Sequence, residues 1–248
     1  MPSPPIRAFF GHHKCGTSWI ARVIDDVCAI AGLKIAHHHY ENLFDGDIVA
    51  LQRSSPFDFW RYTNADINFT RDVDLLGFHV VRDPRDVIVS AYFSHLHSHA
   101  DGNWPRLRHY RPYLRGLSKQ AGIKAEMEFC GIFLFHMLSW DYCRPNVLEL
   151  RFEDLISDEF NQFERIFRFL KMVPEPLRAA DLAQVVRQNT FQVLSGGRKP
   201  GEQDIQNHYR LGTPGDWREH LDDSHIDYFK KLYNPLLIKL GYESKEDW

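Results

Sequence analysis

The sequence has few cysteines, little net charge and no long apolar run. No run of apolar residues approaches the roughly 18–20 that a bilayer crossing needs, and Met1–Pro5 opens no secretory signal. The net charge of −3 gives no bulk attraction to nucleic acid or to an anionic membrane. The four cysteines have no CxxC or zinc-ligand spacing, which favours free thiols in a reducing compartment; they are Cys15, Cys28, Cys130 and Cys143. We therefore expect a cytoplasmic protein with no membrane span and no nucleic-acid partner.

The length and the composition fit one folded domain. The chain has 248 residues, of which 44% are hydrophobic and 14% aromatic, so it can bury one large core and is not a disordered chain. It contains no internal repeat and no low-complexity tract. We expect a single domain over residues 1–248.

Apolar runs of strand length alternate with segments of helical periodicity along the chain. This alternation is typical of a parallel sheet that is covered by helices on both faces. We therefore predict an α/β fold with three layers and a central parallel sheet. We expect strands at 6–10, 33–38, 75–81 and 147–151, and helices at 17–31, 86–97, 126–142, 158–170, 179–188 and 224–240.

The segment from Phe9 to Ile20 reads as the end of a strand, a short loop and the start of a helix. A helix N-terminus presents backbone N–H groups and a partial positive charge, and so attracts phosphate. Gly16 lets the backbone approach an anion closely, and Lys14 adds a mobile positive charge. Thr17 and Ser18 add hydroxyl donors in the first helical turn. We interpret the segment as a phosphate-binding turn, although these residues alone also fit an ordinary turn between a strand and a helix.

The order of residues in this turn differs from that of nucleoside-triphosphate loops. In those loops the lysine follows the second glycine and stands next to the hydroxyl that binds Mg²⁺. Here Lys14 comes two residues before Gly16. The order therefore disfavours a P-loop kinase or nucleotide hydrolase, which stays the alternative function.

A second segment combines a buried strand with cationic and hydroxyl side chains. The apolar run 75–81 leads directly into Arg82, and the pair Asp83-Pro84 begins the next helix. Ser90 lies about two turns into that helix. Ligands of open α/β sheets bind at the carboxyl ends of strands, and a guanidinium there suits a phosphate dianion.

These two segments resemble the sulfotransferases that use 3′-phosphoadenosine 5′-phosphosulfate (PAPS). Residues 14–19 match the family order K-x-G-T-[ST]-W, and residues 82–92 match R-[ND]-P-x-D-x-x-V-S-x-Y. The resemblance implies that the first segment holds the 5′-phosphosulfate and that Arg82 and Ser90 hold the 3′-phosphate. It also implies that Trp19 stacks on adenine, and that Cys15 takes the place of the usual serine.

Weaker matches extend the resemblance to about residue 217. Residues 148–155 resemble a strand followed by Y-E-D-L, with Phe152 in place of the tyrosine near adenine, and Asn189 and Phe191 resemble a T-S-F contact to adenine. Residues 208–217 resemble R-K-G-x-x-G-D-W, whose arginine and glycine also hold the 3′-phosphate. Here Arg210 and Gly212 remain, and Leu211 replaces the lysine.

The resemblance implies transfer of a sulfuryl group from PAPS to a hydroxyl or amine, with adenosine 3′,5′-bisphosphate (PAP) as product. We expect Lys14 to neutralise the leaving oxygen, and we expect no metal requirement because Lys14 and backbone N–H groups can hold the donor. A non-catalytic protein that binds PAPS or PAP is a further alternative. The family's C-terminal dimer segment is not recognisable, so the oligomeric state stays open.

The general base is not fixed by the motifs. Cytosolic relatives use a histidine in a K-T-H segment, which has no counterpart here, and other branches use a glutamate after the first helix. The candidates here are His37, His39 and Glu41, and then His95. His79 lies inside a buried strand and is interpreted as a core histidine.

Three stretches lack clear periodicity. Residues of about 40–74 and 98–120 are predicted to be loops on the acceptor side, and residues of about 195–217 are predicted to close over the donor. The aromatic residues of the first two favour a small ring-containing molecule or a carbohydrate as acceptor.

Overall fold

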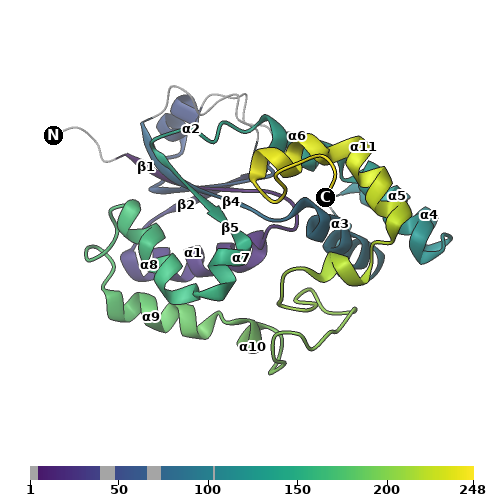
Figure 1. Cartoon of the computed structure of the whole chain (residues 1–248). Helices are drawn as coiled ribbons and strands as arrows, with labels where there is room; N and C mark the ends of the chain where they lie inside the picture. Colours follow the sequence, from purple (N-terminus) through teal and green to yellow (C-terminus); the bar gives the residue numbers. More distant parts are fainter. Residues whose placement is uncertain (1–4, 40–47, 66–73, 103) are drawn as a thin grey trace. The chain divides into compact units, whose positions relative to one another are not determined.

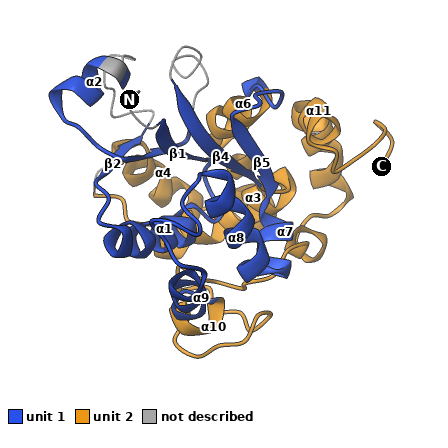
Figure 2. Ribbon diagram, turned by 90° about the vertical axis from the view of Figure 1, so that its left-hand side faces the viewer, with its two compact units in different colours: residues 1–81, 139–190 blue, residues 82–138, 191–248 orange. Residues whose placement is uncertain are grey.

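The computed structural model describes residues 5–39, 48–65, 74–102 and 104–248. These residues form two compact units, each built from two stretches of the chain (Figure 2). Unit 1 comprises residues 1–81 and 139–190, and unit 2 comprises residues 82–138 and 191–248. The expectation of a single domain stays a prediction.

Unit 1 contains the predicted parallel sheet. Its five strands run in the order β2-β3-β1-β4-β5, and all four pairings are parallel. The strands are β1 (Ile6–Gly11), β2 (Ile35–His39), β3 (Phe59–Thr63), β4 (Leu75–Val81) and β5 (Val147–Arg151). The prediction of an α/β fold around a central parallel sheet is confirmed.

The helices of unit 1 lie on both faces of this sheet (Figure 1). Helices α1, α8 and α9 lie on one side, and α2 lies on the other. Their bounds are α1 (Thr17–Ala31), α2 (Ile48–Ser54), α7 (Phe152–Ser157), α8 (Glu159–Phe169) and α9 (Ala179–Gln188). The apolar stripe of α8 includes the fully buried Phe163, Ile166 and Phe167, so burial of this stripe is what holds the helix in place.

The prediction of an irregular loop at 40–74 is wrong for the part of it that the structure describes. That part contains α2 and β3, and Phe57, Phe59, Trp60 and Tyr62 are core residues rather than side chains that face an acceptor. Trp60 stacks on Tyr62 with ring centroids 5.1 Å apart and packs with Phe10 and Trp140. The strand carries apolar side chains on both faces, so it lacks the alternation by which a strand is recognised.

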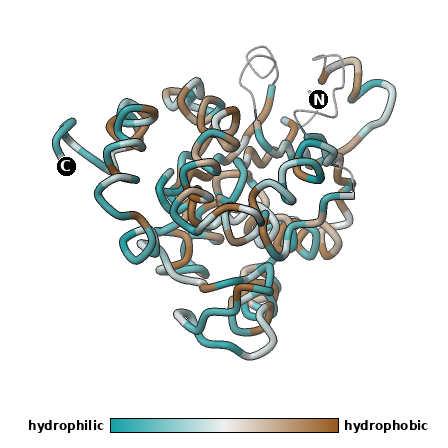
Figure 3. The backbone as a smooth tube through the Cα atoms, turned by 90° about the vertical axis from the view of Figure 1, so that its right-hand side faces the viewer, coloured by the Kyte–Doolittle hydropathy of each residue, from teal (hydrophilic) through white to brown (hydrophobic). Residues whose placement is uncertain are grey.

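Unit 2 is helical. It contains α3 (Pro84–Phe93), a π-helical turn at Ser94–Ser98, α4 (Pro105–Arg115), α5 (Lys119–Phe129), α10 (Phe191–Leu194), a 3₁₀ turn at Asp216–Glu219 and α11 (Asp223–Leu240), together with most of α6 (Gly131–Ser139). Hydrophilic and hydrophobic stretches follow one another along the backbone of the chain (Figure 3). Of the helices in the described ranges, none has both the length and the apolar character that a membrane crossing requires.

Several predicted boundaries in the helical segments need correction. The stretch 98–120 contains helix α4, which was missed because Pro105 and Pro112 suggested a loop, although a proline at the first helical position is favourable. The single helix expected at 126–142 is divided between α5 and α6 at Cys130 and Gly131. The helix expected at 86–97 starts at Pro84, as the cap by Asp83 requires, and its last turn is π-helical.

Gly77 allows β4 to pack against the core, because a Cβ there would lie 2.6 Å from the ring of Phe10. We predict that Gly77→Ala lowers the free energy of unfolding by about 1–3 kcal/mol, since the buried ring has to shift. Gly102→Ala is the matched control, because no atom lies within 4 Å of a Cβ at that position. Urea unfolding of both variants measures the difference, and equal stability would contradict the close packing of β4 on Phe10.

Candidate functional site

The loop between β1 and α1 has the backbone of an anion-binding turn. Lys14 and Gly16 both have left-handed backbones, with φ of 61° and 75°. The Thr17 hydroxyl donates to the His12 carbonyl at 2.7 Å, and the Cys15 N–H donates to the same oxygen at 3.2 Å. No side chain caps the start of α1, whose N-cap is Gly16. The first N–H groups of the helix therefore stay available to an anion.

Phe152 and Trp19 hold this loop against the rest of unit 1. A Cβ on Gly16 would lie 2.7 Å from the Phe152 ring, so only glycine fits there. The Trp19 indole N–H donates to the Asn189 carbonyl at 2.7 Å, and its ring meets that of Phe163 edge to face at 5.3 Å. Of the residues predicted for the donor site, the structure thus brings Gly16, Trp19, Phe152 and Asn189 together. Contact of Trp19 with adenine stays a prediction, because its ring is part of this packing.

A chain of hydrogen bonds runs from β5 through β4 to the loop. Glu149 accepts from Nδ1 of His79 at 2.6 Å, and Nε2 of His79 lies 2.7 Å from Nε2 of His12. The Trp140 indole N–H donates to the other oxygen of Glu149 at 2.9 Å. Both histidines are fully buried, which confirms His79 as a core histidine. His12, the first residue after β1, is therefore linked to the Glu149 carboxylate through His79, and no local sequence pattern indicated this link.

The predicted bases His37 and His39 lie on β2. Nε2 of His37 lies 3.3 Å from the Thr63 hydroxyl, and Nε2 of His39 lies 2.5 Å from the amide nitrogen of Asn64. Partial burial, followed in size by the charge of Arg61, lowers the pKa of His37 below its usual value. Glu41 lies outside the described residues.

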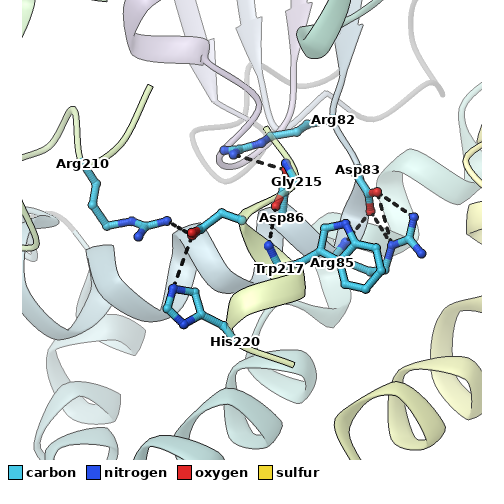
Figure 4. A network of polar contacts seen from close by, with 9 residues as sticks. Arg82, Asp83, Arg85, Asp86, Arg210, Gly215, Trp217 and His220 are labelled. Carbon is cyan, nitrogen blue, oxygen red and sulfur yellow. Dashed lines mark hydrogen bonds and ion pairs between the residues drawn. The ribbon is translucent and has the colours of Figure 1, made fainter. Parts of the chain in front are cut away.

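In unit 2, Arg82 and Asp86 form a buried polar cluster at the start of α3 (Figure 4). Arg82 lies 3.6 Å from Asp86, and Asp86 accepts the backbone N–H groups of Gly215 at 2.7 Å and Trp217 at 2.9 Å. This carboxylate therefore ties the segment that precedes α11 to the first turn of α3. Ser90 lies two turns further along α3 and is half-buried.

The predicted donor-closing segment packs on itself around Phe191. A Cβ on Gly212, whose φ is 73°, would lie 2.5 Å from the Phe191 ring. Arg210 pairs with Asp216 and lies over the ring of Phe93 at 4.4 Å. The Leu211 carbonyl accepts the N–H of Gly201 at 2.8 Å. Unit 2 therefore brings together Phe191 and Gly212 and holds the Arg210 guanidinium in a fixed orientation.

Arg85 has a structural role that the sequence did not reveal. Its guanidinium makes paired hydrogen bonds with Asp83 and contacts Glu243 at 2.5 Å. The same group lies over Trp217 at 4.0 Å and over Trp248 at 4.5 Å. These contacts use the whole guanidinium, so Arg85 joins the C-terminal segment to α3.

His95, the second predicted base, is fully buried in unit 2. Its Nδ1 lies 2.6 Å from Glu126, and Cys130 donates to the same carboxylate at 3.2 Å. The possible ligand atoms of these three side chains all lie within 4.8 Å of one another. Within the described ranges, this is the group that could hold a metal ion. In the structure they bond directly to one another beneath the rings of Trp104 and Phe129.

Comparison with known proteins gives a consistent result. A family model described as "Sulfotransferase domain" matches residues 78–241, which include the Arg82 segment but not the loop at 12–18. The 3-alpha-hydroxysteroid sulfotransferase of Cavia porcellus is 28% identical over 177 residues, which cover 66% of this chain and 56% of that protein. Sulfotransferase 2A1 of Rattus norvegicus is 28% identical over 171 residues, covering 62% of this chain and 54% of that protein. The chain spans about half the length of these curated relatives.

Two solved structures show the same fold. Mouse sulfotransferase SULT7A1 in complex with PAP has a TM-score of 0.66 at 19% identity, with 95% of this chain and 85% of that chain covered. Retinol dehydratase in complex with androsterone and the inactive cofactor PAP has a TM-score of 0.58 at 17% identity, with 96% and 82% covered.

Asp86 is the residue on which the cluster of unit 2 depends. We predict that Asp86→Ala lowers the free energy of unfolding by about 2–4 kcal/mol, because it leaves the Gly215 and Trp217 N–H groups and the Arg82 charge without their shared acceptor. Asp181→Ala removes an exposed ion pair with Arg178 and is the control, with no measurable change expected. Equal unfolding curves for the two variants would show that Asp86 does not hold this segment.

Proposed function

The chain belongs to the sulfotransferase family, and we propose that it transfers a sulfuryl group from PAPS to a hydroxyl group of an acceptor and releases PAP. The family model covers well over half of the chain, and the structure has the parallel sheet of that family. This chain spans only about half the length of the curated relatives. The support for the proposed activity therefore comes from the residues of this chain itself.

The loop after β1 is the observation that carries this proposal. It combines a helix start without a side-chain cap, two left-handed residues and a lysine between a strand and a helix. We propose that the N–H groups of residues 16–18 and the Ser18 hydroxyl bind the 5′-phosphate, while the Thr17 hydroxyl donates to the His12 carbonyl and holds the loop. Ser18 is exposed and Thr17 is partly exposed, which supports the proposal that a ligand can reach this turn.

The 3′-phosphate is assigned to the cations of unit 2. Arg82 follows Val81 of β4 by one peptide bond, and Arg210 and the Gly212 N–H belong to the segment that Asp86 anchors. The burial of Arg82 strengthens its interaction with an anion, because the low local dielectric screens charges less than water does. Ser90, the partly buried Phe152 and Phe191 and the buried Asn189 complete the proposed nucleotide contacts.

Sulfuryl transfer has three requirements that these residues must meet. The acceptor oxygen must lie in line with the sulfur–oxygen bond that breaks, its proton must be removed, and the charge on the departing phosphate oxygen must be neutralised. We assign the last role to Lys14, whose ammonium group sits on a loop that Thr17 and His12 hold in one conformation. A cation at this position supplies the stabilisation without a metal ion.

The acceptor is proposed to be a small alcohol with a ring system. One relative is named as a 3-alpha-hydroxysteroid sulfotransferase, and one structural neighbour was solved with androsterone. The aromatic residues at 57–62 no longer support this choice, because they are buried. An amine or carbohydrate acceptor and a cytoplasmic location stay predictions from the sequence.

Substitution of Lys14 distinguishes an enzyme that transfers a sulfuryl group from a protein that only binds the nucleotide. We predict that Lys14→Asn lowers the rate of sulfuryl transfer by about 10²–10³-fold, as expected for loss of one group that stabilises the leaving oxygen. Asparagine tolerates the left-handed backbone at this position. Lys171→Asn changes another lysine with positive φ and is the matched control, with an unchanged rate. A protein that binds PAP but transfers no sulfate, in the wild type as in the variant, would be a non-catalytic binding protein.

Arg82 tests the assignment of the 3′-phosphate. We predict that Arg82→Ala weakens PAP binding by about 2–4 kcal/mol, as for loss of one partner in a desolvated charge pair. Titration calorimetry with PAP in the presence of EDTA measures this change, and Arg187→Ala on the exposed end of α9 is the control. Loss of all binding in EDTA would favour a nucleotide enzyme that depends on Mg²⁺.

A further inference from the structure

A row of polar side chains crosses one face of the sheet in unit 1, from β5 to the end of β1. In the strand register, His79 of β4 stands opposite Glu149 of β5 on one side and opposite Phe10 of β1 on the other. Residues two apart along a strand share a face, so His12 continues the face of Phe10. Both histidines are fully buried, and the Glu149 side chain is 26% exposed. The row therefore connects a partly exposed carboxylate to the residue that begins the phosphate-binding turn.

The directions of the hydrogen bonds in this row follow from the groups themselves. The Trp140 indole N–H can only donate, and it donates to one oxygen of Glu149 at 2.9 Å. The other oxygen of this carboxylate lies 2.6 Å from Nδ1 of His79 and accepts its proton. With both rings neutral, Nε2 of His79 carries a lone pair, and Nε2 of His12 donates to it at 2.7 Å. The observed contacts thus form one continuous chain from His12 to the carboxylate.

The backbone of His12 closes the turn that carries Lys14. Its carbonyl oxygen accepts the Cys15 N–H at 3.2 Å and the Thr17 hydroxyl at 2.7 Å. The first of these bonds makes a β-turn whose third residue is Lys14, which has the left-handed φ of 61°. The backbone of Lys14 is therefore placed relative to His12, and the ring of His12 is anchored through His79 to the neighbouring strands.

We propose that Glu149 is a positioning residue for sulfuryl transfer and acts on Lys14 through the two histidines of the row, an inference that rests on the function proposed above. The bonds to the His12 carbonyl hold the turn to itself, and the row of side chains holds the turn to the sheet. Hydrogen bonds to a carboxylate are about twice as strong as neutral ones, so β5 is a firm anchor. A reacting group that is misplaced by about 1 Å can lose about 10²-fold in rate.

His79→Phe breaks the row and keeps its packing. The new ring can still stack on Trp140, as His79 does at 4.2 Å, but both side-chain hydrogen bonds are lost. We expect kcat, per site that binds PAP, to fall about 10–100-fold for transfer of radiolabelled sulfate from PAPS to a panel of phenols and hydroxysteroids. The KM for PAPS should stay within about threefold, because the N–H groups at the start of α1 still bind the donor.

Asn146→Ala is the matched control for loss of stability. The Asn146 amide donates to the Leu75 carbonyl at 3.1 Å, where the same pair of strands, β4 and β5, begins. Its removal weakens the pairing of these strands at the end remote from the turn. We expect a lower thermal midpoint and an unchanged kcat.

A double-mutant cycle shows whether His79 acts through Lys14. In the Lys14→Asn background, His79→Phe should lower the rate by less than about threefold further, because the group that it positions is already absent. A side chain that contributes only to stability would lower the rate by the same factor in both backgrounds.

Glu149→Gln tests the row with almost no change in side-chain volume. The amide oxygen takes the Trp140 N–H, so the amide nitrogen faces Nδ1 of His79 and donates to it. The proton between the two rings then belongs to Nε2 of His79, and the row stays continuous in the opposite direction. Nitrogen NMR of the imidazoles should show His79 protonated on Nδ1 in the wild type and on Nε2 in this variant. We expect kcat within about fivefold of the wild type, whereas Glu149→Leu should lose as much as His79→Phe.

An unchanged kcat in His79→Phe, or equal losses in the two Lys14 backgrounds, would overturn the proposal. A wild-type His79 that is protonated on Nε2 and not on Nδ1 would overturn it as well. A wild-type protein that binds PAP but transfers no sulfate to any acceptor would instead overturn the proposed function, even where NMR finds the proton of His79 on Nδ1.

Discussion

Parallel hydrogen bonding of β1 to both β3 and β4 is the constraint on which the rest of the structure depends. The register fixes Gly11, Thr63 and Val80 in one row, and the chain leaves each strand at that edge. The phosphate-binding turn follows Gly11, Asn64 follows Thr63, and Arg82 comes two residues after Val80. Aromatic packing of Phe10, Trp60 and Trp140 on one face of the sheet keeps this register, since a shift by one residue would turn these rings to the other face.

A multiply charged donor requires local cations in a chain whose net charge is only −3. The structure meets this requirement in two separate ways. In unit 1, backbone N–H groups and Lys14 are presented by a loop that the Thr17 hydroxyl and the Phe152 ring hold in place. In unit 2, carboxylates orient the guanidinium groups, as Asp216 does for Arg210. These groups lose their conformational entropy when the protein folds and not when the donor binds, which is the physical basis of preorganisation.

The sequence predicted the local features of this fold well and the distant contacts poorly. Helix α1 and the turn before it follow from the glycines at 16 and 32, which take left-handed conformations at its two ends. Strand β3 was missed because it is buried on both faces and shows no alternation. Motif residues were located because they lie close together in the chain. In contrast, the bond from Asn64 to His39 spans 25 residues and that from Asp86 to Gly215 spans 129, and no local pattern reports such pairs.

A crystal structure of the protein with bound PAP tests the central claim most directly. The account predicts that the 5′-phosphate lies on the N–H groups at the start of α1, within reach of Lys14, and that the 3′-phosphate contacts the Arg82 guanidinium. A nucleotide bound elsewhere, or bound at the loop with its 3′-phosphate turned away from Arg82, would contradict it.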